Sequence, residues 1–208
     1  MIKNKTLIGI FFACFTLCAA LPARAVDVST RSFAGCGFPD TGQKTCYDAT
    51  GLIACPAAGT ALAQDGTYGP GVGQPSYTEN KVGTALVTVD NRTGLMWVTN
   101  PADAGMDVTY TWPLALAACE ASVFAGYSDW RLPNARELMS IVDYSKAAGP
   151  TLNAAFFPNT HSNYYWTSTT YAPDPTLAWY VDFSAGYVHL DTKTNSASYA
   201  RCVRGGAL

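Results

Sequence analysis

The sequence contains only two histidines, His161 and His189, and just 13% of its 208 residues are charged. A histidine-rich metal site is therefore excluded. The 13 basic residues are balanced by 15 acidic ones, so no basic surface predicts nucleic-acid binding. The G-x-S-x-G and H-E-x-x-H motifs are both missing, which argues against two common hydrolase classes. The 18 glycines follow no three-residue period, which excludes a collagen-like stalk.

No apolar run after residue 25 is long enough to span a bilayer. Residues 1–25 have the pattern of a secretory signal peptide, because Lys3 and Lys5 precede an apolar run and an A-x-A cleavage site ends at Ala25. We therefore expect a protein that is secreted, displayed on the cell surface or retained in the periplasm. The signal carries three basic and no acidic residues, which leaves 10 basic and 15 acidic residues and a net charge of −5 in residues 26–208.

Five cysteines lie beyond residue 25, and export makes disulfides their expected state. Residues 35–83 hold three of them, with 10 Gly, four Pro and no apolar periodicity, so residues 26–83 are predicted to form a loop-rich, disulfide-stapled leader. Cys46 and Cys55 bracket a turn-like segment and are the expected local pair. Cys36 is then the odd thiol, either free or available for self-association between chains. A zinc site built from these three cysteines lacks a fourth ligand.

Residues 84–208 contain all five tryptophans and are predicted to form an α+β domain. Strand patterns cover residues 87–89, 95–98, 164–170, 177–183, 187–192 and 199–203. A helix is expected at 112–122. A second helix is expected to begin after Asn134, because Asn134 and Glu137 have the spacing of a capping box. The expected buried positions are Leu114, Ala117, Ala118 and Ala121 in the first helix, Leu138, Ile141 and Val142 after the second cap, and Trp97, Trp130, Trp166 and Trp179.

The apolar pattern of the last hairpin predicts the register of its two strands. If residues 185 and 186 form the loop, Phe183 faces Val188 and Val181 faces Leu190, so one face is apolar. The opposite face, which we expect to be exposed, then holds Tyr180, Asp182, Tyr187, His189 and Asp191. Asp182 would lie opposite His189, where a surface ion pair is expected rather than a catalytic pair.

Several linked motifs occur in a fixed order along this half of the chain. They are GLMW at 94–97, Cys119, GYSDWRLPN at 126–134 with EL at 137–138, YWTSTTY at 165–171, AWYVDF at 178–183 with Gly186, and RCVR at 201–204. Together they resemble the bacterial Lcl-type domain, the C-terminal domain of a collagen-like adhesin. The resemblance covers roughly residues 84–206, and the leader motifs TGQ at 41–43, CYD at 46–48 and QDG at 64–66 are similar to those found before such domains.

The resemblance implies a C-type-lectin-like fold, with two helices packed on a short antiparallel sheet and a distant kinship to formylglycine-generating enzymes. It also implies a surface protein that binds glycans or host polymers. A bond between Cys119 and Cys202 would supply the long-range bridge of such domains and close a loop of more than 80 residues. This bond would also remove the reactive cysteine pair that formylglycine-type chemistry requires. The chain departs from the adhesin in lacking a Gly-X-Y stalk, and its net charge of −5 does not favour a polyanionic ligand.

We therefore expect an exported, non-catalytic protein that recognises a glycan or surface polymer, with no enzyme activity. The alternative is a structural subunit of a surface assembly or filament, joined through Cys36 or the leader. No cofactor is expected, because the calcium motifs of sugar-binding lectins are missing; the oxygen ligands open to calcium are Asp90, Asn91, Asp129 and Asp143. The candidate ligand contacts, each of which could instead be plain surface, are Tyr180, Asp182, Tyr187, His189 and Asp191 on the hairpin face, with Asn163, Tyr164 and Asp174 in flanking loops.

Overall fold

The computed structural model describes residues 40–69 and 73–205. The expected signal peptide and Cys36 lie outside the described residues. The α+β class is confirmed, with three antiparallel sheets and few, short helices in this part of the chain. The helices are α1 (Asp65–Tyr68), the 3-10 helix η2 (Pro101–Ala104), α2 (Trp112–Glu120) and α3 (Ala135–Met139).

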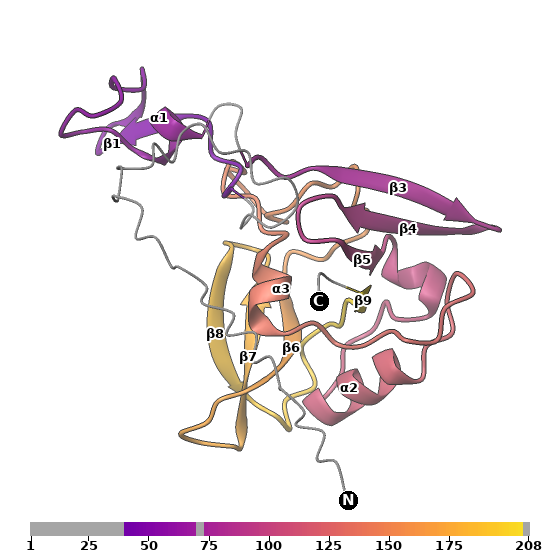
Figure 1. Ribbon diagram of the computed structural model, residues 1–208. Helices are drawn as coiled ribbons and strands as arrows, with labels where there is room; N and C mark the ends of the chain where they lie inside the picture. The colour runs from indigo at the N-terminus through magenta and orange to yellow at the C-terminus, as the bar shows by residue number, and fades with distance from the viewer. Residues whose placement is uncertain (1–39, 70–72, 206–208) are drawn as a thin grey trace, which may run out of the picture. The chain divides into compact units, whose positions relative to one another are not determined.

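The three sheets differ in size and position along the chain (Figure 1). The first pairs β1 (Cys46–Asp48) with β2 (Gly51–Ile53). The second has the order β3-β4-β5-β9 and consists of β3 (Tyr77–Val82), β4 (Ala85–Asp90), β5 (Leu95–Val98) and β9 (Val203–Gly205). The third has the order β6-β7-β8 and consists of β6 (Tyr164–Thr170), β7 (Leu177–Asp182) and β8 (Tyr187–Thr192).

Strand β3 was not predicted, because four of its six side chains are polar or charged and their pattern resembles a loop. It pairs along its whole length with β4, so a hairpin crosses residue 84, where the leader was expected to end. The last strand also differs from expectation, since it begins at Val203 rather than at residue 199. The strand–turn–strand pattern at residues 85–98 is confirmed, and Asp90 closes that turn by accepting hydrogen bonds from Arg92 and Thr93.

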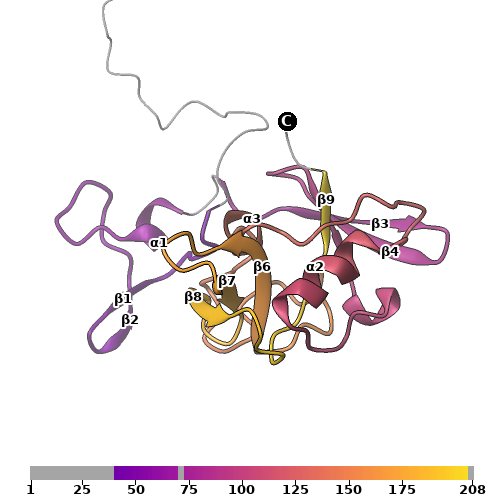
Figure 2. The same cartoon turned by 90° about the horizontal axis from the view of Figure 1, so that it is seen from below.

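Helix α2 forms where it was expected, but its predicted buried face is wrong. Ala115 and Cys119 are fully buried, whereas Leu114 is 58% exposed. The Cys119–Cys202 disulfide fixes which side of the helix faces the core, and that side is rotated from the one that Leu114 suggested. Figure 2 shows α2 beside β6, against which it packs.

Helix α3 begins as the sequence predicts, because both halves of the capping box are present. The Asn134 side chain accepts from the backbone N–H groups of Arg136 and Glu137, and the Glu137 carboxylate accepts from the Asn134 N–H at 2.8 Å. Leu138, Ile141 and Val142 are buried as expected, but the helix ends at Met139, so only Leu138 belongs to it. Helix α3 packs on β6 and β7. The sequence therefore determines this helix locally.

We expect Glu137→Gln to lower the free energy of unfolding at pH 7 by about 1 kcal/mol. Burial alone would raise the pKa of Glu137, but the bonds from Arg131 (2.6 and 2.7 Å) and Asn134 outweigh it and lower the pKa below its usual value. A carboxylate with a lowered folded pKa stabilises the protein above its unfolded pKa, and this contribution is lost as the pH falls. Urea unfolding at several pH values would check this: the difference between wild type and variant should shrink below about pH 4.5, and a constant difference would contradict it.

Two apolar clusters cover the two faces of the third sheet. The first includes Trp166, Ala178 and Tyr180 from one face of the sheet. The second includes Tyr165 and Val181 from the other face, together with Phe183, which directly follows β7. Because β7 is the middle strand and is covered on both sides, Tyr180 and Asp182 are buried, and their expected exposure is wrong. Trp97, Trp130 and Trp166 lie fully in the core as expected, whereas Trp179 is only half-buried.

The β7–β8 register differs from the predicted one by two residues. Val181 lies opposite Val188, Tyr180 opposite His189 and Asp182 opposite Tyr187, so residues 183–186 form a four-residue loop. The loop is closed by the Gly186 N–H, which donates to the Asp182 carbonyl at 2.7 Å, and Gly186 has a left-handed φ of 80°. A shift of two keeps each side chain on its predicted face, but the expected Asp182–His189 ion pair is not formed.

Both predicted disulfides are confirmed. Cys46–Cys55 joins the ends of the β1–β2 hairpin, and Cys119–Cys202 joins α2 to the segment before β9 across 83 residues. The long bridge connects the helical part of the domain to its last strand, as the sequence resemblance implied.

Candidate functional site

The predicted contact residues of the hairpin lie on one face of the third sheet. Tyr164, Asp182 and Tyr187 lie opposite one another across β6, β7 and β8, and the next row places Tyr180 opposite His189. Alternation along the strands sends these side chains to the same face. We call Tyr164, Tyr180, Tyr187 and His189 the tyrosine face.

Three rings of the tyrosine face, those of Tyr164, Tyr180 and His189, form an aromatic row. The Tyr180 ring lies 4.7 Å from that of Tyr164 and 6.1 Å from that of His189, measured between centroids. Tyr180 is buried beneath its neighbours, whereas Tyr187 is 46% exposed and His189 is exposed. Edge strand β8 thus presents the rings of Tyr187 and His189 to solvent, and the His189 ring lies beside buried Tyr180.

Burial and nearby acidic groups keep these phenols protonated. Burial, with smaller effects from Tyr164, Tyr187 and two carboxylates, raises the pKa of Tyr180 to about 12. A hydrogen bond to Asp182 raises the pKa of Tyr187 above its usual value. Both hydroxyl groups therefore remain neutral hydrogen-bond donors across the physiological pH range.

The carboxylates of this face already have partners within the protein. Asp182 accepts from the Ser184 N–H at 2.7 Å, and Asp191 accepts from the Asn195 side chain at 2.6 Å. The two loop candidates lie at opposite ends of β6: Asn163 precedes the strand and accepts from the Tyr164 N–H, whereas Asp174 follows it and bonds to Thr176. Asn163 therefore lies next to Tyr164 at the start of β6, whereas Asp174 lies beyond the other end of the strand, and neither side chain bonds to a ring of the tyrosine face in the described hydrogen bonds.

The four residues considered as oxygen ligands for calcium each have a hydrogen-bond or ion-pair partner within the protein. Asp90 binds Arg92 and Thr93, and Asn91 binds Ser76 and Thr78. Asp129 pairs with Arg204 at 2.6 Å, and Asp143 binds Ser145. Among the described residues there is no group of three or more His, Cys, Asp or Glu side chains that could hold a metal ion.

One ionisable pair was missed by the sequence analysis. The His161 Nε2 lies 2.7 Å from the Asp107 carboxylate, and the imidazole stacks on Tyr199 with a centroid distance of 4.2 Å. Both members of the pair are partly exposed. The two residues are 54 positions apart and neither lies in a recognisable motif, so no local signal predicts their contact.

The motifs that carried the family resemblance hold the domain together. Arg204 makes two hydrogen bonds to Asp129 and lies over the Tyr127 ring at 3.7 Å. The indole N–H of fully buried Trp130 donates to the Phe124 carbonyl, and Arg131 pairs with Val203 through the backbone. These residues join the 126–134 segment to the last strand, so their contacts explain the fold rather than a binding site.

These features define a disulfide-bonded α+β domain that displays an aromatic face. Residues 86–204, more than half of the chain, match the Lcl C-terminal domain family, and the protein belongs to this family. Membership indicates a surface-associated protein. A comparison with curated proteins found no match.

The described residues contain no helix that is both long and apolar enough to cross a membrane. The two disulfides are compatible with an extracellular location.

Proposed function

We propose that this protein is an exported, non-catalytic recognition protein that binds a glycan or surface polymer through the tyrosine face. The observation that supports this is the pair of exposed rings on edge strand β8, His189 beside buried Tyr180 and Tyr187 with its hydroxyl bonded to Asp182. Sugar-binding sites use flat rings against the apolar face of the sugar and fixed polar groups around them. The Tyr187 hydroxyl supplies a polar group on this face.

A C-type-lectin-like fold is part of this proposal. Its support is the packing of α2 and α3 on the third sheet, together with the long-range Cys119–Cys202 bridge. An enzymatic role has less support, because neither carboxylate of the tyrosine face pairs with a histidine. The His161–Asp107 pair is not accompanied by a serine, cysteine or threonine nucleophile in the described contacts.

A glycan array probed with the purified, oxidised protein tests the proposal, and we expect selective binding that persists in EDTA. Tyr187→Ala should weaken that binding about tenfold, because it removes the exposed ring from the sugar face. Tyr68→Ala, which removes an exposed tyrosine of the leader, is the matched control and should bind as wild type. A blank array with folded protein, or equal binding by both variants, would contradict the proposal. Loss of binding in EDTA would instead indicate a calcium-dependent site.

A structural subunit of a surface assembly is the second candidate. It is favoured by the outward side of α2 and the loops beside it, where Leu114, Val108 and Val123 are all more than half exposed. Non-reducing gels and size-exclusion chromatography separate the two functions. A stable oligomer with no glycan binding would support assembly, whereas a monomer that binds glycans would support recognition.

A further inference from the structure

A pocket of about 330 Å³ is lined by none of the residues of the tyrosine face. Three segments that are distant in sequence line it. Residues 42–47 and 74–77 precede the region that matches the family, and residues 143–153 lie within it. Its volume is at the lower end of the range for small-molecule sites, which suits one small ligand. The lining side chains used below are Lys44, Tyr47, Gln74, Tyr77, Asp143 and Asn153.

The leader segment is fixed against the 143–153 loop. The Tyr144 N–H donates to the Thr41 carbonyl at 2.9 Å. Gly42 has a left-handed φ of 84°, and a Cβ at this position would lie 2.6 Å from the Asp143 Oδ1. Only glycine allows this approach. The wall of the pocket therefore depends on a glycine in the leader and a carboxylate in the domain.

The polar groups at the pocket are held in place by their own contacts. The Asp143 Oδ1 accepts from the Ser145 N–H at 2.9 Å and from its hydroxyl at 2.6 Å. The Gln74 Nε2 donates to the Gly69 carbonyl at 2.7 Å, which leaves the amide oxygen as an acceptor. Fixed groups of this kind lower the entropic cost of binding, because few side chains must be ordered when a ligand arrives.

Two tyrosines contribute to the lining. Tyr77 packs edge-on against Phe157 at 5.0 Å. Burial, with the nearby charges of Asp90 and Asp143, raises its pKa well above the usual value, so its hydroxyl remains a donor. Tyr47, which is 44% exposed, lies in β1 directly after the disulfide cysteine Cys46.

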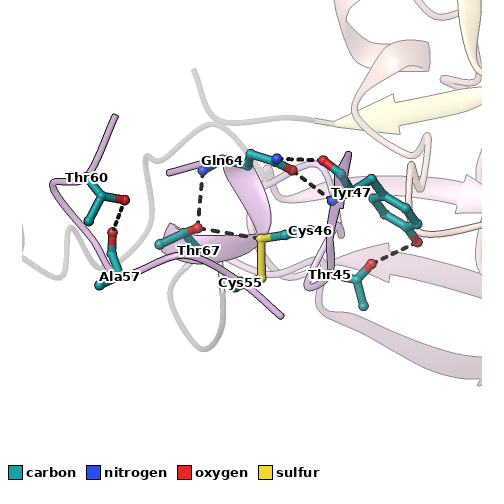
Figure 3. Close-up of a disulfide and its surroundings, with 8 residues drawn as sticks. All are labelled: Thr45, Cys46, Tyr47, Cys55, Ala57, Thr60, Gln64 and Thr67. Atoms are coloured by element: carbon teal, nitrogen blue, oxygen red, sulfur yellow. Dashed lines mark hydrogen bonds between the residues drawn. A yellow bond between two sulfur atoms is a disulfide. The ribbon is translucent and has the colours of Figure 1, made fainter. Parts of the chain in front are cut away.

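The Cys46–Cys55 hairpin orients Tyr47. Gln64 accepts from the Tyr47 N–H at 2.9 Å and donates to its carbonyl at 2.6 Å, while the Thr45 hydroxyl donates to the Tyr47 hydroxyl at 2.9 Å (Figure 3). The Tyr47 backbone is thus bonded on both sides next to the disulfide. A small, stapled hairpin is a way to hold one exposed ring rigidly.

We propose that this pocket binds a single neutral sugar unit. The lining carries one cation, Lys44, and one anion, Asp143, and the Asp143 carboxylate also lies 3.8 Å from the Lys146 ammonium. The lining itself therefore has no net formal charge, and its anion is already paired, which favours a neutral ligand. Lys44, the Tyr77 hydroxyl and the Asn153 amide offer donors, and Asp143 and Gln74 offer acceptors, which matches a ring carrying several hydroxyl groups. The inference deepens the proposed function by adding a second sugar position, and it rests on that function only for the class of ligand.

Saturation-transfer NMR on the full oxidised chain, with the methyl glycosides of glucose, galactose, mannose and N-acetylglucosamine as probes, tests the inference. We expect at least one neutral glycoside to bind at millimolar concentration and methyl glucuronide to bind less well. Tyr47→Ala should weaken binding at least fivefold, and Gly42→Ala should do the same by displacing the leader from Asp143. Lys81→Ala, on exposed β3, should bind the probe as wild type. In a Tyr187→Ala background, which removes the contribution of the tyrosine face, the loss caused by Tyr47→Ala should persist.

The outcomes separate this inference from the proposed function. Array binding that is lost in Tyr187→Ala, with no neutral glycoside bound in the pocket, would overturn the inference alone. Glycoside binding that survives both Tyr47→Ala and Gly42→Ala, or a preference for methyl glucuronide, would also overturn it. Thermal melting of each variant shows whether it is folded, and chemical-shift changes confined to residues 42–47 and 143–153 in wild type would place the bound probe directly.

Discussion

The double variant Cys119→Ala/Cys202→Ala is expected to unfold with a free energy about 4–5 kcal/mol lower than that of the wild type. The bridge spans 83 residues, and the entropy that a cross-link removes from the unfolded chain increases with the length of the closed loop. Both cysteines are fully buried in the first apolar cluster, so the variant also loses packing between α2 and the last strand. Urea unfolding followed by tryptophan fluorescence measures the difference.

The matched control is Cys46→Ala/Cys55→Ala, which removes the short bridge. Its cysteines are separated by nine residues, for which the same relation gives about 2–3 kcal/mol. The loss should also be confined to the leader, because Cys55 is exposed and the bridge spans only β1 and β2. Equal effects of the two double variants on the main unfolding transition would contradict the account based on loop length.

Local signals in the sequence predicted a large part of this fold. The Asn134–Glu137 capping box determined the start of α3, and the turn after Asp90 determined the β4–β5 hairpin. In each case, the residues that fix the backbone lie within three or four positions of one another. Because these contacts are local in the sequence, the pattern can be recognised without the tertiary structure.

The features that the sequence did not predict depend on distant partners. The buried side of α2 was set by the bond from Cys119 to Cys202, not by the spacing of its apolar residues. The burial of Asp182 follows from the position of β7 in the middle of its sheet. The register of β7 and β8 was wrong by two, because such a shift keeps the apolar residues on the same face and leaves the pattern unchanged.

The candidate sites show the same division between local and distant signals. The tyrosine face could be anticipated, since its strands are consecutive and alternate regularly. The pocket could not, because its walls come from the leader and from a loop about 100 residues later in the chain, and the leader shows no periodicity. The contact of Gly42 with Asp143 has no signature in the sequence beyond a glycine in a glycine-rich segment.

Arg201 offers the second large effect, because it is fully buried and none of the ion pairs among the described residues includes it. Its guanidinium donates to the Val98 and Thr99 carbonyls at 2.8 and 2.9 Å and to the Thr160 hydroxyl at 2.6 Å. Burial lowers the pKa of Arg201 to about 10, so the group still carries its charge at neutral pH. Polar groups thus replace part of the water that this charge loses on folding, because the Arg201 Nε has no hydrogen-bond partner within the described part of the chain.

We expect Arg201→Ala to lower the free energy of unfolding by about 3–5 kcal/mol, through a cavity and three acceptors left without a donor. Arg201→Met should lose less, because it refills the space and removes the desolvated charge, although the acceptors remain unpaired. Chemical denaturation of both variants checks the order. If Met were as destabilising as Ala, the effect of Arg201 would come from its hydrogen bonds alone, which hold the end of β5 and the Thr160 loop to the segment before β9. If Met matched the wild type, the bonds of Arg201 would contribute nothing beyond the cost of burying its charge.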